Sequence, residues 1–151
     1  MTTLNIAAAC LLDPQDRLLL VRKRGTRALM LPGGKREAGE SALQALQREL
    51  LEELQLHLDA SALEPLGRFR APAANEADTW VDAEIFVARL PHAVQAAAEL
   101  EELAWLEPGQ PHPENLAPLL RDHVLGLVRK VVERRSGKAK SAEEAQFTCC
   151  K

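Results

Sequence analysis

The sequence predicts an α/β sandwich with a mostly mixed sheet. Apolar runs typical of strands stand before and after a segment whose apolar residues have helical spacing, and a second helical pattern follows near residue 120. The chain has 151 residues, enough to bury the core of a single domain without disulfide or metal crosslinks. The predicted order is therefore strands, helix, strands, helix.

The first predicted elements are two strands joined by a turn. Residues 4–12 and 17–22 are apolar, and the intervening 13–16 has the sequence Asp-Pro-Gln-Asp, which is typical of a turn. A basic stretch, 22–24, follows the second run. The next residues predict a loop because four turn-forming residues interrupt them: Pro32, Gly33, Gly34 and Gly39.

A helix is predicted over residues 41–54. Ser41 followed three positions later by Gln44 fits a capping box, which marks a helix start. Successive helical residues turn by about 100°. Four leucines then form one apolar stripe, which should face the core: Leu43, Leu46, Leu50 and Leu54.

The second half of the chain predicts three more strands and one more helix. Residues 63–71 and 79–90 have strand-like patterns, 103–106 fits a short strand, and 93–102 is open between helix and loop. The apolar spacing over 114–135 predicts a helix. Residues 136–151 are small and polar, so we expect a domain at 1–135 with a flexible tail.

Composition narrows the class of protein. The net charge of −3 gives no reason to expect nucleic-acid binding, and no apolar run reaches the length of a membrane span. Cys10, Cys149 and Cys150 form neither a disulfide framework nor a metal-ligand spacing, and the N-terminus has no signal-peptide pattern. We expect a soluble cytoplasmic protein, either a monomer or a homodimer.

An acidic cluster lies beside the leucine stripe of the predicted helix. Glu49, Glu52 and Glu53 stand at i, i+3 and i+4, where like charges destabilise a helix by roughly 0.2–0.5 kcal/mol per pair. A solvated acidic face is one interpretation. Two observations favour another: only Arg48 is close by to compensate, and the helix follows a Gly-rich turn suited to an anion. Clustered carboxylates beside such a turn suggest Mg²⁺ bridging protein and phosphate.

The segment 34–56, GKREAGESALQALQRELLEELQL, resembles the Nudix box. The box residues that match are Gly34, Glu40, Arg48, Glu49, Leu50, Glu52, Glu53 and Leu56. One position departs, because Gln55 stands where the family has the glycine that ends the helix. The helix should therefore run on slightly or end with a non-glycine cap, without consequence for the metal site.

The resemblance implies a Nudix α/β/α sandwich and an activity. Nudix enzymes hydrolyse a nucleoside diphosphate linked to another group, with Mg²⁺, or Mn²⁺ as a substitute, activating the attacking water. The resemblance assigns the metal to Glu49, Glu52 and Glu53. The general base is either Glu52 or Glu53, and the family often adds a carboxylate from a loop outside the box. Three loop residues are eligible, although an exposed acidic turn is the other interpretation: Glu99, Glu101 and Glu102, of which we select Glu102.

Other site residues follow from the same resemblance. Arg48 should pair with a box carboxylate such as Glu40 and hold it ionised. Gly33 and Gly34 let the backbone approach the metal and the phosphates.

The sequence identifies the substrate-binding groups less clearly than the metal ligands. Arg22, Lys23 and Arg24 are candidates to meet phosphates, with an exposed basic strand end as the alternative for at least one of them. Trp105 is the best candidate for stacking on a base, because it follows the acidic loop. The pair Asn75-Glu76 either reads a base edge or forms an ordinary turn.

The partner implied is a small-molecule nucleotide, and the sequence leaves its identity open. The absence of tyrosine counts against dinucleoside polyphosphates, which family members recognise with a tyrosine after the box. Pro72, with fifteen residues between it and the box, fits ADP-ribose hydrolases. The early first strand instead resembles MutT-like hydrolases. We lean to a (d)NTP, including oxidised nucleotides, over ADP-ribose or a nucleotide sugar, and over a non-catalytic module, which typically loses box glutamates.

Overall fold

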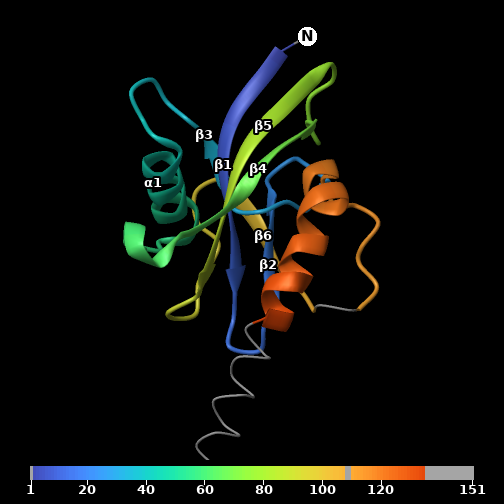
Figure 1. Cartoon of the computed structure of the whole chain (residues 1–151). Helices are drawn as coiled ribbons and strands as arrows, with labels where there is room; N and C mark the ends of the chain where they lie inside the picture. Colours follow the sequence, from blue (N-terminus) through green and yellow to red (C-terminus); the bar gives the residue numbers. More distant parts are fainter. Residues whose placement is uncertain (1, 108–109, 135–151) are drawn as a thin grey trace, which may run out of the picture.

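A six-stranded mixed sheet forms the centre of the structure (Figure 1). The structure is a computed structural model that describes residues 2–107 and 110–134. The main strand order is β4-β5-β1-β2-β6, and β3 also pairs with β1. The strands are β1 (Thr2–Leu12), β2 (Leu18–Lys23), β3 (Gly33–Lys35), β4 (Glu64–Pro72), β5 (Thr79–Arg89) and β6 (Leu100–Leu106).

The pairing of β1 with β5 makes the sheet mixed. These two strands run parallel, in unbroken register from Thr2 opposite Thr79 to Leu12 opposite Arg89. All other pairs are antiparallel, including β1 with β2, which the predicted turn at 13–16 joins. The predicted mixed sheet is therefore confirmed.

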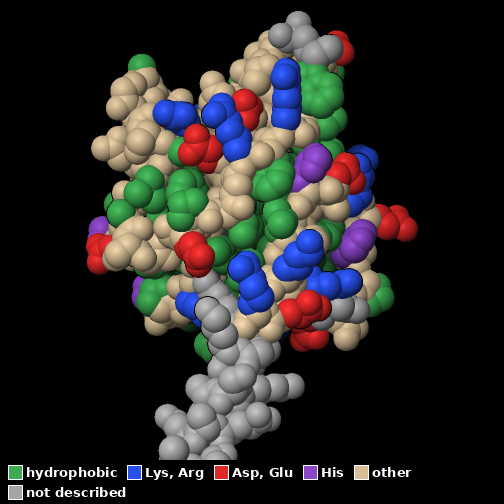
Figure 2. All heavy atoms as spheres, viewed as in Figure 1, with side chains coloured by type: hydrophobic (Ala, Val, Ile, Leu, Met, Phe, Trp, Pro, Cys, Tyr) green, Lys and Arg blue, Asp and Glu red, His purple; other side chains and the backbone are tan. Residues whose placement is uncertain are grey.

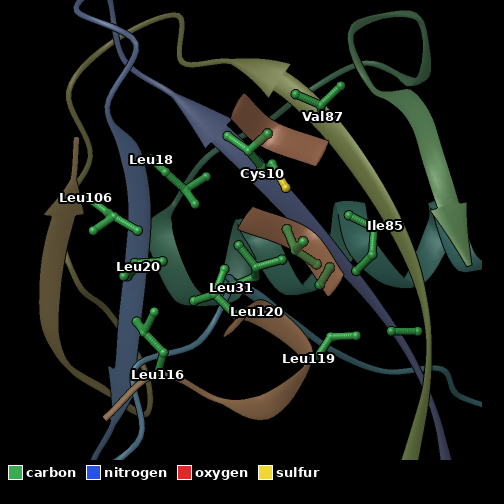
Figure 3. Close-up of a cluster of buried hydrophobic side chains, with 14 of the residues drawn as sticks. Cys10, Leu18, Leu20, Leu31, Ile85, Val87, Leu106, Leu116, Leu119 and Leu120 are labelled. Atoms are coloured by element: carbon green, nitrogen blue, oxygen red, sulfur yellow. The ribbon is translucent and has the colours of Figure 1, made fainter. Parts of the chain in front are cut away.

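Successive residues of β1 point to opposite faces of the sheet, and each face has its own core. Ala7, Ala9 and Leu11 contact α1, whereas Ala8, Cys10 and Leu12 face the C-terminal helix. Figure 3 shows side chains of the second core, which contains Cys10 and Leu20 of the sheet together with Leu119 and Leu120. Figure 1 shows the two helices on opposite faces, so the predicted α/β/α sandwich is confirmed.

The helix α1 (Ala42–Leu54) begins and ends as its sequence indicates. The Ser41 hydroxyl accepts a hydrogen bond from the Gln44 N–H at 3.1 Å, and the Gln44 side chain accepts one from the Ser41 N–H at 2.9 Å. This is the predicted capping box. Gln55 takes the left-handed conformation, with φ 52°, so the helix ends with a non-glycine cap rather than running on.

The C-terminal helix begins later than predicted. Helical residues span 118–134, with a π-helical segment η2 (Leu120–Val124), so the expected start at 114 was wrong. Pro118 explains the difference, because proline has no N–H to donate and suits the first helical position, while it disfavours helix in the residue before it. The preceding residues instead bond to Leu29, which pairs with Leu116.

Several strand boundaries also differ from prediction. β3 was missed entirely because it lies in the predicted glycine loop. β6 begins at Leu100 rather than at 103, and residues 93–97 form no regular helix. A short 3-10 helix, η1 (Ala60–Ala62), precedes β4. The predicted tail, with Cys149 and Cys150, lies outside the described residues.

The described surface is mixed in charge. On the face seen in Figure 2, basic and acidic side chains are interspersed with apolar ones. In the described ranges, no helix is both long and apolar enough to cross a membrane.

Candidate active site

The acidic residues of α1 meet the glycines of β3. The Gly33 N–H donates to Glu53 Oε1 at 3.2 Å across the buried helix–strand contact. Gly34 faces Glu49 so closely that a Cβ built on it would lie 2.4 Å from the Glu49 carboxyl carbon. The structure therefore brings together the predicted box glutamates and the predicted glycine turn, and it shows why position 34 has no side chain.

Glu53 is a buried carboxyl group with one unsatisfied oxygen. Its side chain is 4% exposed, and Oε2 has no hydrogen-bond partner. Burial raises the pKa of Glu53 to about 8; the Gly33 N–H and nearby Lys23 oppose this shift, and Glu49 and Glu99 add to it. Such a group is stable when ionised only if a cation reaches it.

Arg48 organises the neighbouring carboxylates. Its Nε and Nη2 donate to the two Glu40 oxygens at 2.8 and 2.9 Å, which is the predicted pair, and its Nη1 donates to Glu49 at 2.9 Å. A hydrogen bond from Arg48 lowers the pKa of Glu40 to about 2. Burial raises the pKa of Glu49, and Arg48 offsets only part of that shift. Arg48 therefore holds Glu40 and Glu49 in position, and Glu53 Oε2 keeps no hydrogen-bond partner.

The carboxylates of α1 are of the kind that binds a divalent cation, but their present arrangement does not form a complete set of metal ligands. Across residues 2–107 and 110–134, no three acidic, histidine or cysteine side chains already form a metal-sized group. Glu49 points to Arg48, Glu53 points to Gly33, and Glu52 is 54% exposed. Carboxylate oxygens are the ligands that Mg²⁺ and Mn²⁺ prefer, and the partnerless oxygen of Glu53 provides one. The side chains would have to turn toward one another to share an ion.

The basic stretch after β2 divides into two roles. The Arg22 guanidinium donates to the Thr26 carbonyl at 2.9 Å and to Glu102 at 3.2 Å, and lies 3.8 Å from Glu101. These contacts leave Arg22 poorly placed to meet a phosphate. Lys23, in contrast, has no ion pair with any other described residue and lies close enough to Glu49 and Glu53 to lower the pKa of both.

The loop before β6 brings a different glutamate to the box from the one we selected. Glu102 is engaged with Arg22 on the neighbouring strand. Glu99 lies close enough to raise the pKa of Glu53, and the adjacent loop is anchored to the helix by a 2.8 Å hydrogen bond from the Ala97 N–H to the Glu53 carbonyl. Among the eligible loop residues, Glu99 is therefore better placed than Glu102.

A cavity of about 330 Å³ opens beside these groups. Gly33, Gly34 and Lys23 line it, and so does the β4–β5 loop. Its walls are mostly apolar and come from β1, from residues 30–31, from Val81 and from the start of the C-terminal helix. The predicted glycines and Lys23 therefore lie between the acidic cluster and a ligand-sized cavity.

Trp105 lies away from this cavity. Its ring stacks with the Arg17 guanidinium, whose carbon is 5.3 Å from the ring centroid, and it borders two shallow hollows near the β1–β2 turn. The lining of the cavity contains no aromatic residue among those described. The structure does not bring Trp105 to the other predicted site residues, so a base in the cavity would contact aliphatic side chains.

Some cavity residues had no clear signal in the sequence. Lys35 follows the two glycines directly but belongs to the short strand that was missed. Leu119 and Leu120 line the cavity as well, whereas the apolar spacing over 114–135 predicted only that they belong to a helix. Pro118 could have marked the start of their helix, because proline suits the first helical position.

Comparisons with known proteins agree with the geometry. A family model described as NUDIX domain matches residues 1–125. The human protein 8-oxo-dGDP phosphatase NUDT18 is 33% identical over 138 residues, which cover 86% of this chain and 39% of that protein. This chain thus spans well under half the length of that relative.

Solved structures share the fold. The MutT NUDIX hydrolase from Burkholderia pseudomallei superposes with a TM-score of 0.65 at 20% identity, covering 86% of this chain and 98% of that one. A bifunctional NMN adenylyltransferase/ADP ribose pyrophosphatase from Francisella tularensis, complexed with AMP and a manganese ion, gives 0.61 at 20% identity, covering 85% and 42%. Since the family model matches residues 1–125, which is most of the chain, the chain belongs to the Nudix family.

Proposed function

We propose that this chain is a hydrolase that splits a diphosphate linkage in a nucleoside diphosphate derivative with the help of Mg²⁺ or Mn²⁺. The observation that carries the proposal is the Glu53 carboxyl group, buried against Gly33 with one oxygen left without a partner. A core carboxyl with a structural role alone would normally have both oxygens satisfied. Family membership and the names of the relatives support the same activity.

Glu49, Glu52 and Glu53 would hold the cation. When bound, the ion neutralises phosphate charge and acidifies a water molecule for attack on phosphorus. The backbone at Gly33 and Gly34 lets the diphosphate approach this edge because no side chain intervenes. Lys23, which has no ion pair in the described part of the chain, is the group that would contact a phosphate oxygen.

Glu52 would accept the proton of the attacking water. Its carboxylate is half exposed and lies 3.7 Å from Arg48 Nη1, so it can reach water while staying close to the box. Glu53 is a poorer base because it is buried and already bonded to Gly33. Glu99, on the loop beside Glu53, would add a carboxylate from outside the helix.

An oxidised guanine nucleotide, as the (d)NTP or the (d)NDP, is the substrate that we favour. The human relative is named for 8-oxo-dGDP, and the cavity of about 330 Å³ suits one nucleoside. ADP-ribose is the second candidate, because Pro72 lines the cavity and one structural neighbour is an ADP ribose pyrophosphatase.

A substrate panel with Mg²⁺ tests the proposal. We expect 8-oxo-dGTP or 8-oxo-dGDP to be hydrolysed at a higher rate than ADP-ribose. Chromatography of the products measures these rates. Glu52→Gln and Glu53→Gln should each lower kcat at least about 100-fold. Glu133→Gln, an exposed change on the C-terminal helix, is the control and should leave kcat unchanged.

Two outcomes would overturn it. If no member of the panel is hydrolysed while nucleotides still bind, the chain is a binding module. If the two box variants retain full activity, the acidic cluster is not the reaction centre.

A further inference from the structure

The cavity beside the acidic cluster has one acidic residue in its lining. Most described lining residues are apolar or glycine, and the polar side chains among them are Lys23, Thr26, Lys35, Asn75 and Glu76. Glu76 comes from the β4–β5 loop, whereas Lys23 ends β2, which β1 separates from β5 in the sheet. A carboxylate in a site for a polyanionic ligand needs an explanation, because it repels phosphate.

The Glu76 carboxylate is available to a ligand. Among the described residues it pairs with the Lys35 ammonium, at 4.0 Å, and the two side chains are 51% and 63% exposed. An exposed pair at that distance contributes little and leaves the carboxylate oxygens free to accept hydrogen bonds. The neighbouring Asn75 amide makes no hydrogen bond to another described residue, so this loop presents to the cavity one polar side chain without such a bond and one that is only weakly paired.

The charges give a bound nucleotide a direction. Lys23 and the Gly33–Gly34 backbone lie next to the α1 carboxylates, so the phosphates belong at that edge. Glu76 must then meet a part of the nucleotide that donates hydrogen bonds. Guanine offers two adjacent donors, N1–H and the N2 amino group, which match the two oxygens of a carboxylate. Adenine offers one amino group beside the N1 lone pair, which a carboxylate repels.

We propose that Glu76 is a specificity-determining residue that selects guanine over adenine by accepting hydrogen bonds from N1–H and N2–H of the base. The proposal rests on the proposed function, in that it places a nucleotide in this cavity. Oxidation at C8 leaves the N1 and N2 donors in place, so Glu76 reads guanine whether or not the base is oxidised. Adenine-containing substrates, ADP-ribose among them, would be disfavoured.

Binding of GMP and AMP to the metal-free protein, measured by calorimetry, tests this without requiring catalysis. We expect GMP to bind more tightly than AMP, and Glu76→Gln to reduce the GMP-to-AMP affinity ratio by about tenfold or more. AMP should bind the variant as tightly as before or more tightly, because a glutamine amide can donate to adenine N1 and accept from its amino group. Glu84→Gln is the matched control, since Glu84 also pairs with a cation at 4.0 Å but does not line the cavity.

Three results would overturn the proposal. The first is GMP and AMP binding equally to the unchanged protein, or no detectable GMP binding at millimolar concentration. The second is an equal loss of GMP and AMP affinity in Glu76→Gln. The third is a dependence on the sugar instead of the base, seen as dGMP binding far more weakly than GMP, which would place Glu76 on the ribose hydroxyls.

The test of Glu76 can fail or succeed independently of the test of the proposed function. If no diphosphate is hydrolysed but Glu76→Gln still removes the preference for GMP, the enzyme proposal fails and base selection by Glu76 stands. If hydrolysis proceeds and its preference for guanine is unchanged in Glu76→Gln, only the role of Glu76 fails.

Discussion

Glu53 links the candidate metal site to the stability of the whole protein. Its pKa in the folded chain is about 8, above the ordinary value of a glutamate, because the site is buried. The folded state therefore binds a proton that the unfolded state has already released between about pH 4.5 and pH 8. Over that window the free energy of unfolding should fall as the pH rises.

We predict that Glu53→Gln flattens this pH dependence. Glutamine keeps an oxygen for the Gly33 N–H and carries no charge, so its burial is not opposed at high pH. Thermal unfolding in EDTA from pH 5 to pH 9 measures the effect, and Mg²⁺ should raise the Tm of the parent most at the alkaline end. Glu52→Gln, at an exposed neighbouring position, should keep the slope; a parental slope in Glu53→Gln would contradict the assignment.

Gly34→Ala should damage the site more than the fold. The new methyl group would lie 2.4 Å from the Glu49 carboxyl carbon, so that side chain must move away from Arg48. We expect kcat to fall by about 100-fold, because a displacement of about 1 Å has that effect on a positioned group, with a loss of stability of about 1 kcal/mol.

The matched control is Gly126→Ala. A Cβ at Gly126 would meet nothing within 4 Å, and the residue lies inside the C-terminal helix. Alanine there should stabilise the protein by about 0.5–1 kcal/mol and leave kcat unchanged. Urea denaturation and initial rates measure both; equal kcat losses in the two variants would rule out a specific role for position 34.

The sequence could predict those side-chain contacts that a motif fixes. The pairing of Arg48 with Glu40 is one, since the positions of both are set by the box and the helix. Contacts between loops could not be predicted. Glu99 approaches Glu53, and Glu102 turns to Arg22, only because β6 pairs with β2 in one particular register. Nothing local distinguishes those two glutamates.

At the scale of single elements, the C-terminal end of α1 is unusual and can be tested. Gln55 takes a left-handed conformation, which costs a non-glycine residue about 1 kcal/mol. Gln55→Gly should therefore stabilise the protein by about that amount.

At the other end of α1, Ser41→Ala should destabilise the protein by about 1 kcal/mol, because the capping box is lost. Urea midpoints measure both changes; a Gln55→Gly variant no more stable than the parent would show that the glutamine conformation carries no strain.

The predicted elements were correct where their signals were local. The cap at Ser41 and the leucine spacing set the bounds of α1 to within a residue. β3 has three residues, two of them glycine, and exists because Ile6, Ala7 and Ala8 of β1 offer it backbone partners. No pattern within such a segment separates a strand from a loop, so β3 was missed for a reason that lies elsewhere in the chain.

On the scale of the whole molecule, the sheet separates two independent cores. Leu50 packs in the core under α1, and Val124 packs in the core under the C-terminal helix. Both are completely buried, so Leu50→Ala and Val124→Ala should each lower the free energy of unfolding by about 2–4 kcal/mol. In the double variant the losses should add to within about 0.5 kcal/mol, as guanidinium denaturation would show. A larger departure would mean that the sheet transmits strain between its faces.

The parallel pairing of β1 with β5 has a consequence for how the chain is made. Thr2 lies opposite Thr79, so the central strand waits for a partner synthesised much later. During that interval the apolar stretch from Ala7 to Leu12, completely or almost completely buried in the finished protein, can pack against β2, β3 and α1, but the edge that β5 will pair with stays open. A nascent polypeptide of this kind is prone to aggregate on the ribosome and would benefit from a chaperone until the last residues of β5 have emerged.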